Sequence, residues 1–157
     1  MNYVKNYQEF LNEKKAHFLS GIVLILENKI LLVNPKKYKD APHKWSIPKG
    51  HTEMDYTSLE SALKELQEEA NIDLPETKFI NCKQGVVNYM RNTGREKNLE
   101  FYILKINRSV LPFKLYNDMI LRFYLNKGEI HEAGFFSKTD AMELIESEQK
   151  SILNYID

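Results

Sequence analysis

The distribution of apolar and polar residues predicts a β-hairpin near the start of the chain and two further strands beyond its middle. Within residues 18–33, two runs rich in β-branched and aliphatic residues flank the polar pair Glu27-Asn28, which is typical of a hairpin. Residues 79–90 and 99–106 have a similar strand-like composition, with a polar stretch between them. These runs supply the strands of the predicted sheet.

The clearest predicted helix spans residues 57–70. Thr57, followed three residues later by Glu60, fits a capping box, in which each side chain bonds to the backbone N–H of the other residue. The apolar residues recur at steps of four, three and four and form one stripe, namely Leu59, Leu63, Leu66 and Ala70. The periodicity therefore predicts an amphipathic helix that packs on the core.

Helices are also predicted at the two ends of the chain. Residues 1–16 are expected to form a short N-terminal helical extension, and Ser137 with Asp140 offers a second capping box. That box opens a final helix whose apolar positions are Ala141, Leu144, Ile145, Ile152 and Ile156. Strands that alternate with helices in this way favour a layered α/β or α+β sandwich.

The composition indicates one soluble domain. The 157 residues suit a single core, 43% of them are hydrophobic, and 22 basic residues balance 22 acidic ones. The zero net charge gives no support for a dedicated nucleic-acid or anionic-membrane binder. The single cysteine, Cys82, favours a reducing compartment, and no apolar run is long enough to span a membrane. We therefore expect a single domain over residues 1–157, in a cytoplasmic protein without a membrane partner.

Three glutamates lie on one face of the predicted helix. Glu65 stands three residues before Glu68 and four before Glu69, so the carboxylates occupy neighbouring helical positions. Like charges so placed destabilise a helix by roughly 0.2–0.5 kcal/mol per pair, which a divalent cation with oxygen ligands would offset. A solvated face is the alternative, because Lys64 lies four residues after Glu60 and four before Glu68 and permits ordinary surface ion pairs. The residues that precede the helix decide between the two.

Those preceding residues complete a pattern that resembles the Nudix box. In that family a glycine is followed by five residues and a glutamate, then by seven residues and Arg-Glu-aliphatic-any-Glu-Glu-any-Gly-aliphatic. The residues that match, without insertion, are Gly50, Glu65, Leu66, Glu68, Glu69 and Ile72. Three positions depart from the pattern: Tyr56 replaces the first glutamate, Lys64 the arginine and Asn71 the second glycine. Asn71 is the mildest change, because asparagine tolerates the left-handed conformation of a helix end.

The resemblance implies both a fold and a chemistry. It implies a Nudix-type α-β-α sandwich with a mixed central sheet. It also implies hydrolysis of a phosphoanhydride bond in a nucleoside diphosphate linked to another group, with Mg²⁺ or Mn²⁺ as the cofactor. Carried over by position, the metal ligands are Glu65, Glu68, Glu69 and the carbonyl group of Gly50. The general base varies within the family, and its candidates here are Glu69, Glu65, Glu129 and Glu132.

Three further segments look like the branch that includes the asymmetrical diadenosine tetraphosphate hydrolases. They are Trp45 with Pro48-Lys49-Gly50-His51, the run Asn88-Tyr89-Met90-Arg91-Asn92, and the run from Glu129 to Phe136. By position, Lys49 and His51 flank the glycine where phosphates would lie, and Tyr89 matches a base-stacking tyrosine. Glu53 is a candidate to replace the acid that is missing at Tyr56. The expected partner is therefore a small nucleotide, with a dinucleoside polyphosphate as the best match.

Several alternatives stay open. Related sequences that remove the 5′ cap or 5′ phosphates of RNA, or trim diphosphoinositol phosphates, share part of the pattern, so the RNA 5′ end is a second candidate partner. A catalytically weakened nucleotide-binding module is the alternative of another class, and its best support is Tyr56 and Lys64. Residues 110–127 are atypical of the family, and we expect an extra strand, a packed loop, a lid or a subunit contact there. Both a monomer and a homodimer are compatible with the sequence.

Overall fold

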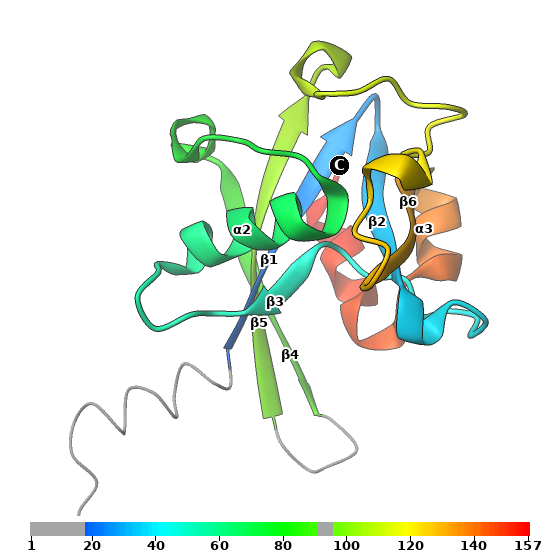
Figure 1. Cartoon of the computed structure of the whole chain (residues 1–157). Helices are drawn as coiled ribbons and strands as arrows, with labels where there is room; N and C mark the ends of the chain where they lie inside the picture. The colour runs from blue at the N-terminus through cyan, green and yellow to red at the C-terminus, as the bar shows by residue number, and fades with distance from the viewer. Residues whose placement is uncertain (1–17, 91–95) are drawn as a thin grey trace, which may run out of the picture.

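A computed structural model of the chain describes residues 18–90 and 96–157, with the side chains of residues 89 and 90 outside that description. Its centre is a six-stranded sheet in the order β4-β5-β1-β2-β6, with β3 paired to β1 (Figure 1). The strands are β1 (Phe18–Leu26), β2 (Lys29–Pro35), β3 (Lys49–His51), β4 (Lys83–Met90), β5 (Glu96–Ile106) and β6 (Ile130–Ser137). The α-helices are α2 (Ser58–Ala70) and α3 (Lys138–Leu144). Short 3₁₀ helices are η1 (Lys36–Tyr38), η2 (Glu76–Phe79), η3 (Arg108–Val110), η4 (Arg122–Tyr124) and η5 (Ser147–Tyr155).

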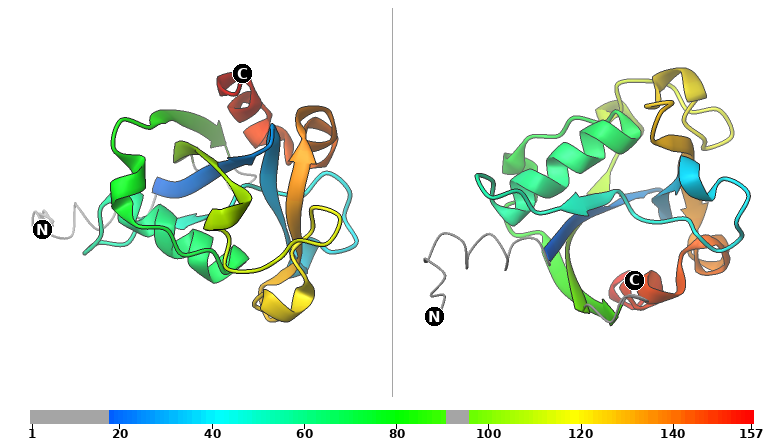
Figure 2. Two further views of the ribbon diagram at one scale, coloured as in Figure 1. Left: turned by 90° about the horizontal axis from the view of Figure 1, so that it is seen from above. Right: turned by 60° about the horizontal axis from the view of Figure 1, so that its bottom comes forward.

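Helical segments lie on both faces of this sheet, as Figures 1 and 2 show. One core cluster, with Leu31 and Leu66, fills the space between the sheet and α2. A second cluster, with Leu32 and Ile145, fills the space between the sheet and the α3–η5 segment. Leu31 and Leu32 face opposite ways because side chains alternate along a strand. Since β1 pairs in parallel with β5 and antiparallel with β2 and β3, the sheet is mixed, and the predicted sandwich is confirmed.

The first hairpin and the central helix form as predicted. Glu27 and Asn28 join β1 to β2 with φ angles of 50° and 65°, the left-handed pair that a two-residue hairpin turn requires. Thr57 and Glu60 form the expected capping box at the start of α2, in which the Thr57 hydroxyl accepts from the Glu60 N–H. Asn71 ends the helix with a φ of 56°, so it adopts the left-handed conformation for which the family pattern has glycine.

The two strands predicted after the middle of the chain have other boundaries. The strand predicted over residues 79–90 begins at Lys83, because Phe79 closes the 3₁₀ helix η2 and Asn81 turns the chain with a φ of 66°. Its partner begins at Glu96, three residues earlier than predicted, because the ladder with β4 continues to that residue. The predicted helix over residues 1–16 lies outside the described residues.

The prediction of one continuous final helix is wrong. The helix α3 ends at Leu144, Ile145 is extended, and the 3₁₀ helix η5 follows. The chain leaves the helix because Trp45 pairs with this segment: its N–H donates to the Leu144 carbonyl and its carbonyl accepts from the Glu146 N–H. Ser137 still caps α3 with its side chain, as predicted. No helix among the described residues is long and apolar enough to cross a membrane.

The segment 110–127 is a loop that packs along the outer edge of β6. Ile120 is buried, and its N–H donates to the carbonyl of Ala133 at 2.9 Å. The carbonyl of Asp118 accepts from the Phe135 N–H at 2.8 Å. Of the four expectations for this segment, the structure contains the packed loop, and it contains no extra strand within these residues.

Candidate functional site

Gly50 and Glu65 form the centre of the site. On β3, Gly50 lies opposite Ser20 of β1, and α2 packs against this strand. A Cβ atom at position 50 would stand only 2.2 Å from Cδ of Glu65. Only glycine leaves room for that carboxylate. The position of the Glu65 side chain therefore depends on Gly50, the first residue of the box.

Glu69 is the second acid held against β3. Its Oε1 atom accepts a hydrogen bond from the backbone N–H of Lys49 at 3.1 Å. About one turn of helix separates Glu69 from Glu65, so both carboxylates leave α2 on the side that faces β3. The fold therefore brings the predicted phosphate-binding lysine and two predicted metal-binding acids to the same place.

Burial and like charges oppose ionisation of both acids. The pKa of Glu65 is raised to about 7 and that of Glu69 to about 8, from an ordinary value of 4.5, and burial is the largest cause. The negative charge of Glu129 contributes to both increases, whereas the positive charge of Lys49 acts against them. Glu65 and Glu69 of α2 and Glu129 of the turn before β6 thus lie close enough to repel one another, and a bound cation relieves such repulsion.

The structure separates the two late acids that the sequence left as alternatives. Glu129 lies in the turn before β6, where its carbonyl accepts from the Lys36 N–H at 2.7 Å, and its charge acts on both acids of α2. Glu132 instead accepts from Nη2 of Arg122 at 3.1 Å, and the same nitrogen donates to Nε2 of His131 at 3.0 Å. Glu129 is therefore the late acid that the fold brings to α2. Sequence analysis missed Arg122, because its local pattern does not indicate a partner ten residues away.

The oxygen atoms near Gly50 are of the kind that bind a hard divalent cation, although their present arrangement does not form a metal site. Among the described residues, no three His, Cys, Asp or Glu side chains are close enough together to hold an ion. Glu65 and Glu69 nevertheless offer carboxylate oxygens beside the carbonyl of Gly50, and Mg²⁺ and Mn²⁺ prefer oxygen ligands. The carboxylate of Glu68 lies 3.9 Å from Nζ of Lys64 and is 40% exposed. Glu68 would have to leave Lys64 before it could join the other two acids.

Two of the departures from the box, Lys64 and Tyr56, lie beside each other, and Lys64 also contacts Glu53. Nζ of Lys64 donates to Oε1 of Glu53 at 2.5 Å and lies 5.5 Å from the centre of the Tyr56 ring. The hydrogen bond to Glu53 raises the pKa of Lys64. The N–H of Glu53 also donates to the Ser61 hydroxyl at 3.1 Å, so this residue ties the loop to α2 twice. The contact supports the hypothesis that Glu53 replaces the missing acid.

The other predicted substrate residues lie at different ends of the sheet. His51 is an exposed residue of β3, next to Gly50 and opposite Leu19 of β1. Tyr89 lies opposite Lys97 on β4, the strand at the far edge of the sheet from β6. The fold thus places His51 beside the acids, whereas the predicted base-stacking tyrosine is several strands away.

Comparison with known proteins finds one family whose model covers most of the chain, and a relative that matches part of it. The family model described as NUDIX domain matches residues 17–155. A curated relative from Sus scrofa, the asymmetrical bis(5′-nucleosyl)-tetraphosphatase, is 42% identical over 48 residues, which cover 31% of this chain and 33% of the relative. The matched part therefore spans about a third of that relative's length.

Two solved structures share the fold. The binary complex of a C. elegans Ap4A hydrolase has a TM-score of 0.65 at 22% identity, covering 88% of this chain and 93% of that one. A bifunctional NMN adenylyltransferase/ADP ribose pyrophosphatase from Francisella tularensis, complexed with AMP and a Mn ion, has a TM-score of 0.62 at 18% identity, covering 92% of this chain and 45% of that one. At such identities the likeness is one of architecture.

Proposed function

Because the chain belongs to the Nudix family, we propose that it hydrolyses a phosphoanhydride bond in a nucleoside diphosphate linked to a further group, with the help of a divalent metal ion. The observation that carries this proposal is the close approach of Glu65 to Gly50 of β3, together with the hydrogen bond from the Lys49 N–H of the same strand to Glu69, one helical turn further along α2. Phosphoryl transfer asks a protein mainly for positioning and for neutralisation of charge. Acids fixed on a rigid helix, facing a cation, meet both needs.

The substrate that we favour is a dinucleoside polyphosphate such as diadenosine tetraphosphate. The run Pro48-Lys49-Gly50-His51 supports it, as does the similarity to a relative that is named as a bis(5′-nucleosyl)-tetraphosphatase. Lys49 brings its positive charge to the two acids of α2, where a phosphate group bridged by a metal would also lie. Asymmetrical hydrolysis of diadenosine tetraphosphate releases ATP and AMP.

Each acid of the site has a separate task in this proposal. Glu65, Glu69 and the carbonyl of Gly50 would hold the metal ion, which when bound supplies Lewis-acid polarisation of phosphate oxygens. A carboxylate oxygen of Glu129 takes the proton of the attacking water, whose oxygen bonds to phosphorus while the bridging oxygen leaves with the other product. Glu132 does not take this role, because Arg122 engages its carboxylate.

A second candidate substrate is the 5′ end of RNA, either capped or triphosphorylated. One observation favours it: the local basic cluster of the chain begins beside Glu129, whose carbonyl accepts from the Lys36 N–H. The cluster consists of Lys36, Lys37, Lys39 and Lys44. Successive phosphates of a nucleic acid bind such lysines, and the phosphates of a diphosphoinositol polyphosphate would meet the same charges.

A nucleotide-binding module without turnover is the alternative of another class. Its basis is the replacement of two box residues by Tyr56 and Lys64. The bond between Lys64 and Glu53 weakens that basis, because the loop and the helix remain tied together. We therefore place the enzyme first.

A hydrolysis screen tests the proposal. The chain would be incubated with Mg²⁺ or Mn²⁺ and with diadenosine tetraphosphate, capped and triphosphorylated RNA, ADP-ribose, nucleoside triphosphates and diphosphoinositol phosphates, and products would be identified by mass. We expect ATP and AMP from diadenosine tetraphosphate, and loss of this activity in Glu69→Gln.

The matched control is Glu60→Gln, on the same helix, because glutamine also satisfies a capping box. Nucleotide binding without turnover across the whole panel would favour the binding module. Full activity in Glu69→Gln would show that the metal-binding acids have been assigned wrongly.

A further inference from the structure

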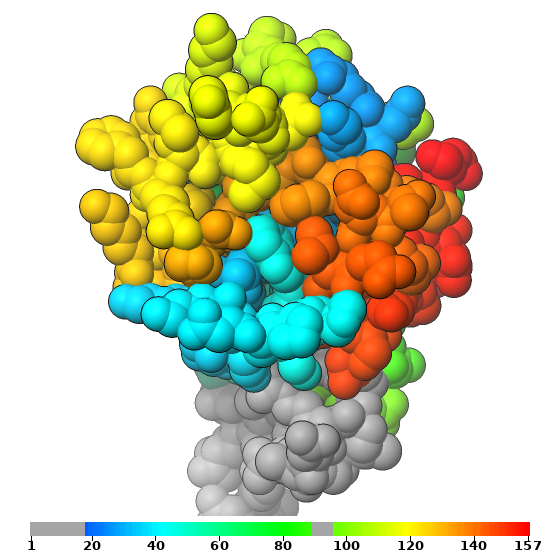
Figure 3. All heavy atoms as spheres, turned by 90° about the vertical axis from the view of Figure 1, so that its right-hand side faces the viewer, coloured from blue at the N-terminus to red at the C-terminus, as the bar shows by residue number. Residues whose placement is uncertain are grey.

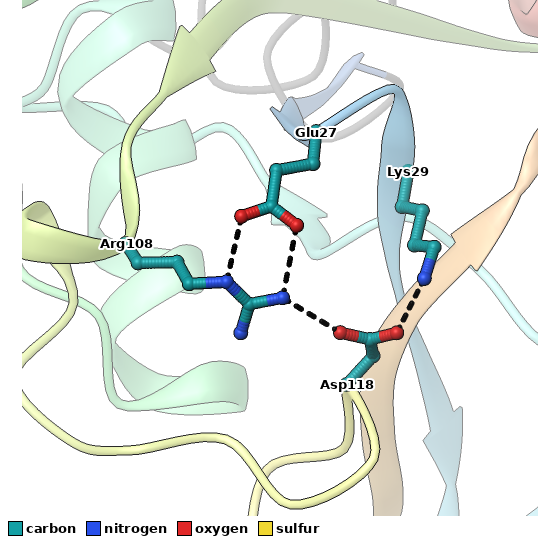
Figure 4. Close-up of polar contacts among 4 residues, drawn as sticks. All are labelled: Glu27, Lys29, Arg108 and Asp118. Atoms are coloured by element: carbon teal, nitrogen blue, oxygen red, sulfur yellow. Dashed lines mark hydrogen bonds and ion pairs between the residues drawn. The ribbon is translucent and has the colours of Figure 1, made fainter.

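The segment 107–128, here called the arm, is fixed where it begins. Arg108 donates to both carboxylate oxygens of Glu27, at 2.7 and 3.0 Å, and to Asp118 at 3.0 Å (Figure 4). Asp118 in turn accepts from Nζ of Lys29 at 2.5 Å. The turn at Asp118 also bonds through its carbonyl to β6. The arm is therefore held both to the first hairpin and to the edge of the sheet.

The arm is also held in place near its end, at η4. Arg122 bonds to Glu132 and to His131, the residues that follow the first residue of β6. The ring of Tyr124 stacks on Phe113, with centroids 4.9 Å apart and planes 24° apart. Both rings pack against the core cluster beneath α2. These contacts set the backbone of η4 at the start of β6.

Phe123 is the residue that this construction presents to solvent. It is 81% exposed, more than any other large apolar residue of the described chain. Its ring meets Tyr124 in an edge arrangement, with centroids 5.3 Å apart and planes 83° apart, so a broad part of the ring stays open. The residues on either side of Phe123 anchor η4, and the exposed ring contributes little to that anchoring. A rigid backbone thus holds an open aromatic ring at a defined place.

That place adjoins the candidate site. The chain runs from η4 through a short turn to Glu129, and the N–H groups of Glu129 and Ile130 both donate to the Asn126 carbonyl. Figures 1 and 2 show η4 on the side of the sheet that α2 covers, and Tyr124 of η4 packs against the same core cluster as α2. In Figure 3 the arm, in yellow, forms one wall of a hollow that is bounded below by the basic loop, in cyan.

We infer that Phe123 is a stacking surface for the second nucleobase of the substrate, the base at the far end of the phosphate chain from the cleaved bond. This inference rests on the proposed function. Aromatic side chains bind bases through their open faces, and one stacked base contributes about tenfold in affinity, which is about 1.4 kcal/mol.

The test compares two substrates that differ only in the second nucleoside, diadenosine tetraphosphate and adenosine 5′-tetraphosphate. For Phe123→Ala we expect KM to rise about tenfold for the dinucleoside, with kcat nearly unchanged, and no change for the mononucleoside. Phe123→Trp should restore KM. The control is Leu121→Ala, since Leu121 is also an exposed apolar residue of the arm and should alter neither constant.

Binding is measured separately from turnover. In Phe123→Trp combined with Glu69→Gln, we expect the dinucleoside to quench the introduced indole at lower concentration than the mononucleoside does, while the buried Trp45 supplies a constant background. Equal effects of Phe123→Ala on the two substrates, or no effect on either, would overturn the stacking role while hydrolysis remained. If neither hydrolysis nor binding of diadenosine tetraphosphate occurs, the proposed function itself fails.

Discussion

The molecule contains two clusters of charged side chains that differ in the signs of their members. The first, here called the acidic cluster, gathers like charges from α2 and the start of β6: Glu65, Glu69 and Glu129. The second, the alternating network, joins opposite charges across the β1–β2 turn and the arm: Glu27, Arg108, Asp118 and Lys29. Both clusters join segments that are distant in sequence, but charges repel one another in the first and attract one another in the second.

The pKa values of the two clusters move in opposite directions. Burial raises the pKa of Glu65 and of Glu69, whereas a hydrogen bond from Arg108 lowers the pKa of Glu27. Hydrogen bonds, first from Lys29, lower the pKa of Asp118 likewise. Folding therefore opposes ionisation in the acidic cluster and favours it in the network. Like charges that remain close together in the folded state destabilise it, and such an arrangement indicates a binding site. Exposed charges of alternating sign anchor a loop but contribute little to the stability of the fold.

The largest effect is expected from Gly50→Ala, which breaks the acidic cluster. The new Cβ atom would stand 2.2 Å from Cδ of Glu65 and would push that carboxylate off the strand. We expect kcat/KM to fall by at least about 100-fold, as when one electrostatic group of an active site is lost. Gly128→Ala is the control, because its Cβ would meet only Oδ1 of Asn126, at an ordinary 3.5 Å. Equal rates for the two variants would remove the Gly50 contact from the mechanism.

The next effect is a decrease in the stability of the metal-free protein as the pH rises. Between the ordinary carboxyl pKa of 4.5 and the raised pKa values of about 7 for Glu65 and 8 for Glu69, the folded chain binds more protons than the unfolded chain. Stability of the metal-free protein should therefore fall as pH rises through this range. From pH 5.5 to 8.5 we expect a loss on the order of 2 kcal/mol, or about 4–8 °C in Tm, measured by circular dichroism in EDTA.

Two additions sharpen that measurement. Mn²⁺ or Mg²⁺ should raise Tm most at the alkaline end, where the acids are charged, and Glu69→Gln should flatten the pH dependence. The alternating network acts at the opposite end of the scale, because the lowered pKa values of Glu27 and Asp118 favour folding above their ordinary range and lose effect in acid. A Tm that rises from pH 5.5 to 8.5 in EDTA would contradict the assigned burial of the two acids.

A smaller effect is expected from the pair of Glu53 and Lys64. Their side chains are 41% and 39% exposed, so a double-mutant cycle with Glu53→Gln and Lys64→Met should give a weak favourable coupling in unfolding free energy. Activity should fall more than stability, because the loop that the pair holds leads from β3 to α2. If activity tracks stability in all three variants, the pair has no separate part in positioning the acids.

The smallest effect is expected in the alternating network itself. Arg108→Gln should lower the unfolding free energy only slightly, since its side chain is 48% exposed, and by less still at high salt. Hydrolysis of adenosine 5′-tetraphosphate should not change. A loss as large as that of Gly50→Ala would mean that the network carries more than the anchoring of a loop.

The elements that the sequence predicted well are those whose contacts are local. The turn at Glu27-Asn28, the capping box of Thr57 and the left-handed end of α2 at Asn71 depend on residues no more than four positions apart. The spacing of Glu65 and Glu69 is likewise a property of one helix. For the same reason the fold class could be predicted, because a sandwich follows from the order of such elements.

The features that escaped prediction depend on partners far along the chain. The pairing of Trp45 with Ile145, which ends α3, joins residues one hundred positions apart. The choice between Glu129 and Glu132 depends on Arg122, whose partner Glu132 lies ten residues further along the chain. Periodicity carries no information about such contacts, since it reports only which face of an element is apolar.

The parallel pairing of β1 with β5 determines the order in which the chain is able to assemble. Phe18 of β1 pairs with Asn98, so the middle of the sheet cannot close until some eighty further residues have been synthesised. The strand β2 pairs with β1 at once through the hairpin, but its other edge waits longer, because Lys29 pairs there with Ser137 of β6. Contacts so distant in sequence form late. A nascent chain therefore carries the acids of α2 before Glu129 has joined them, and the candidate site is among the last of the described parts to be completed.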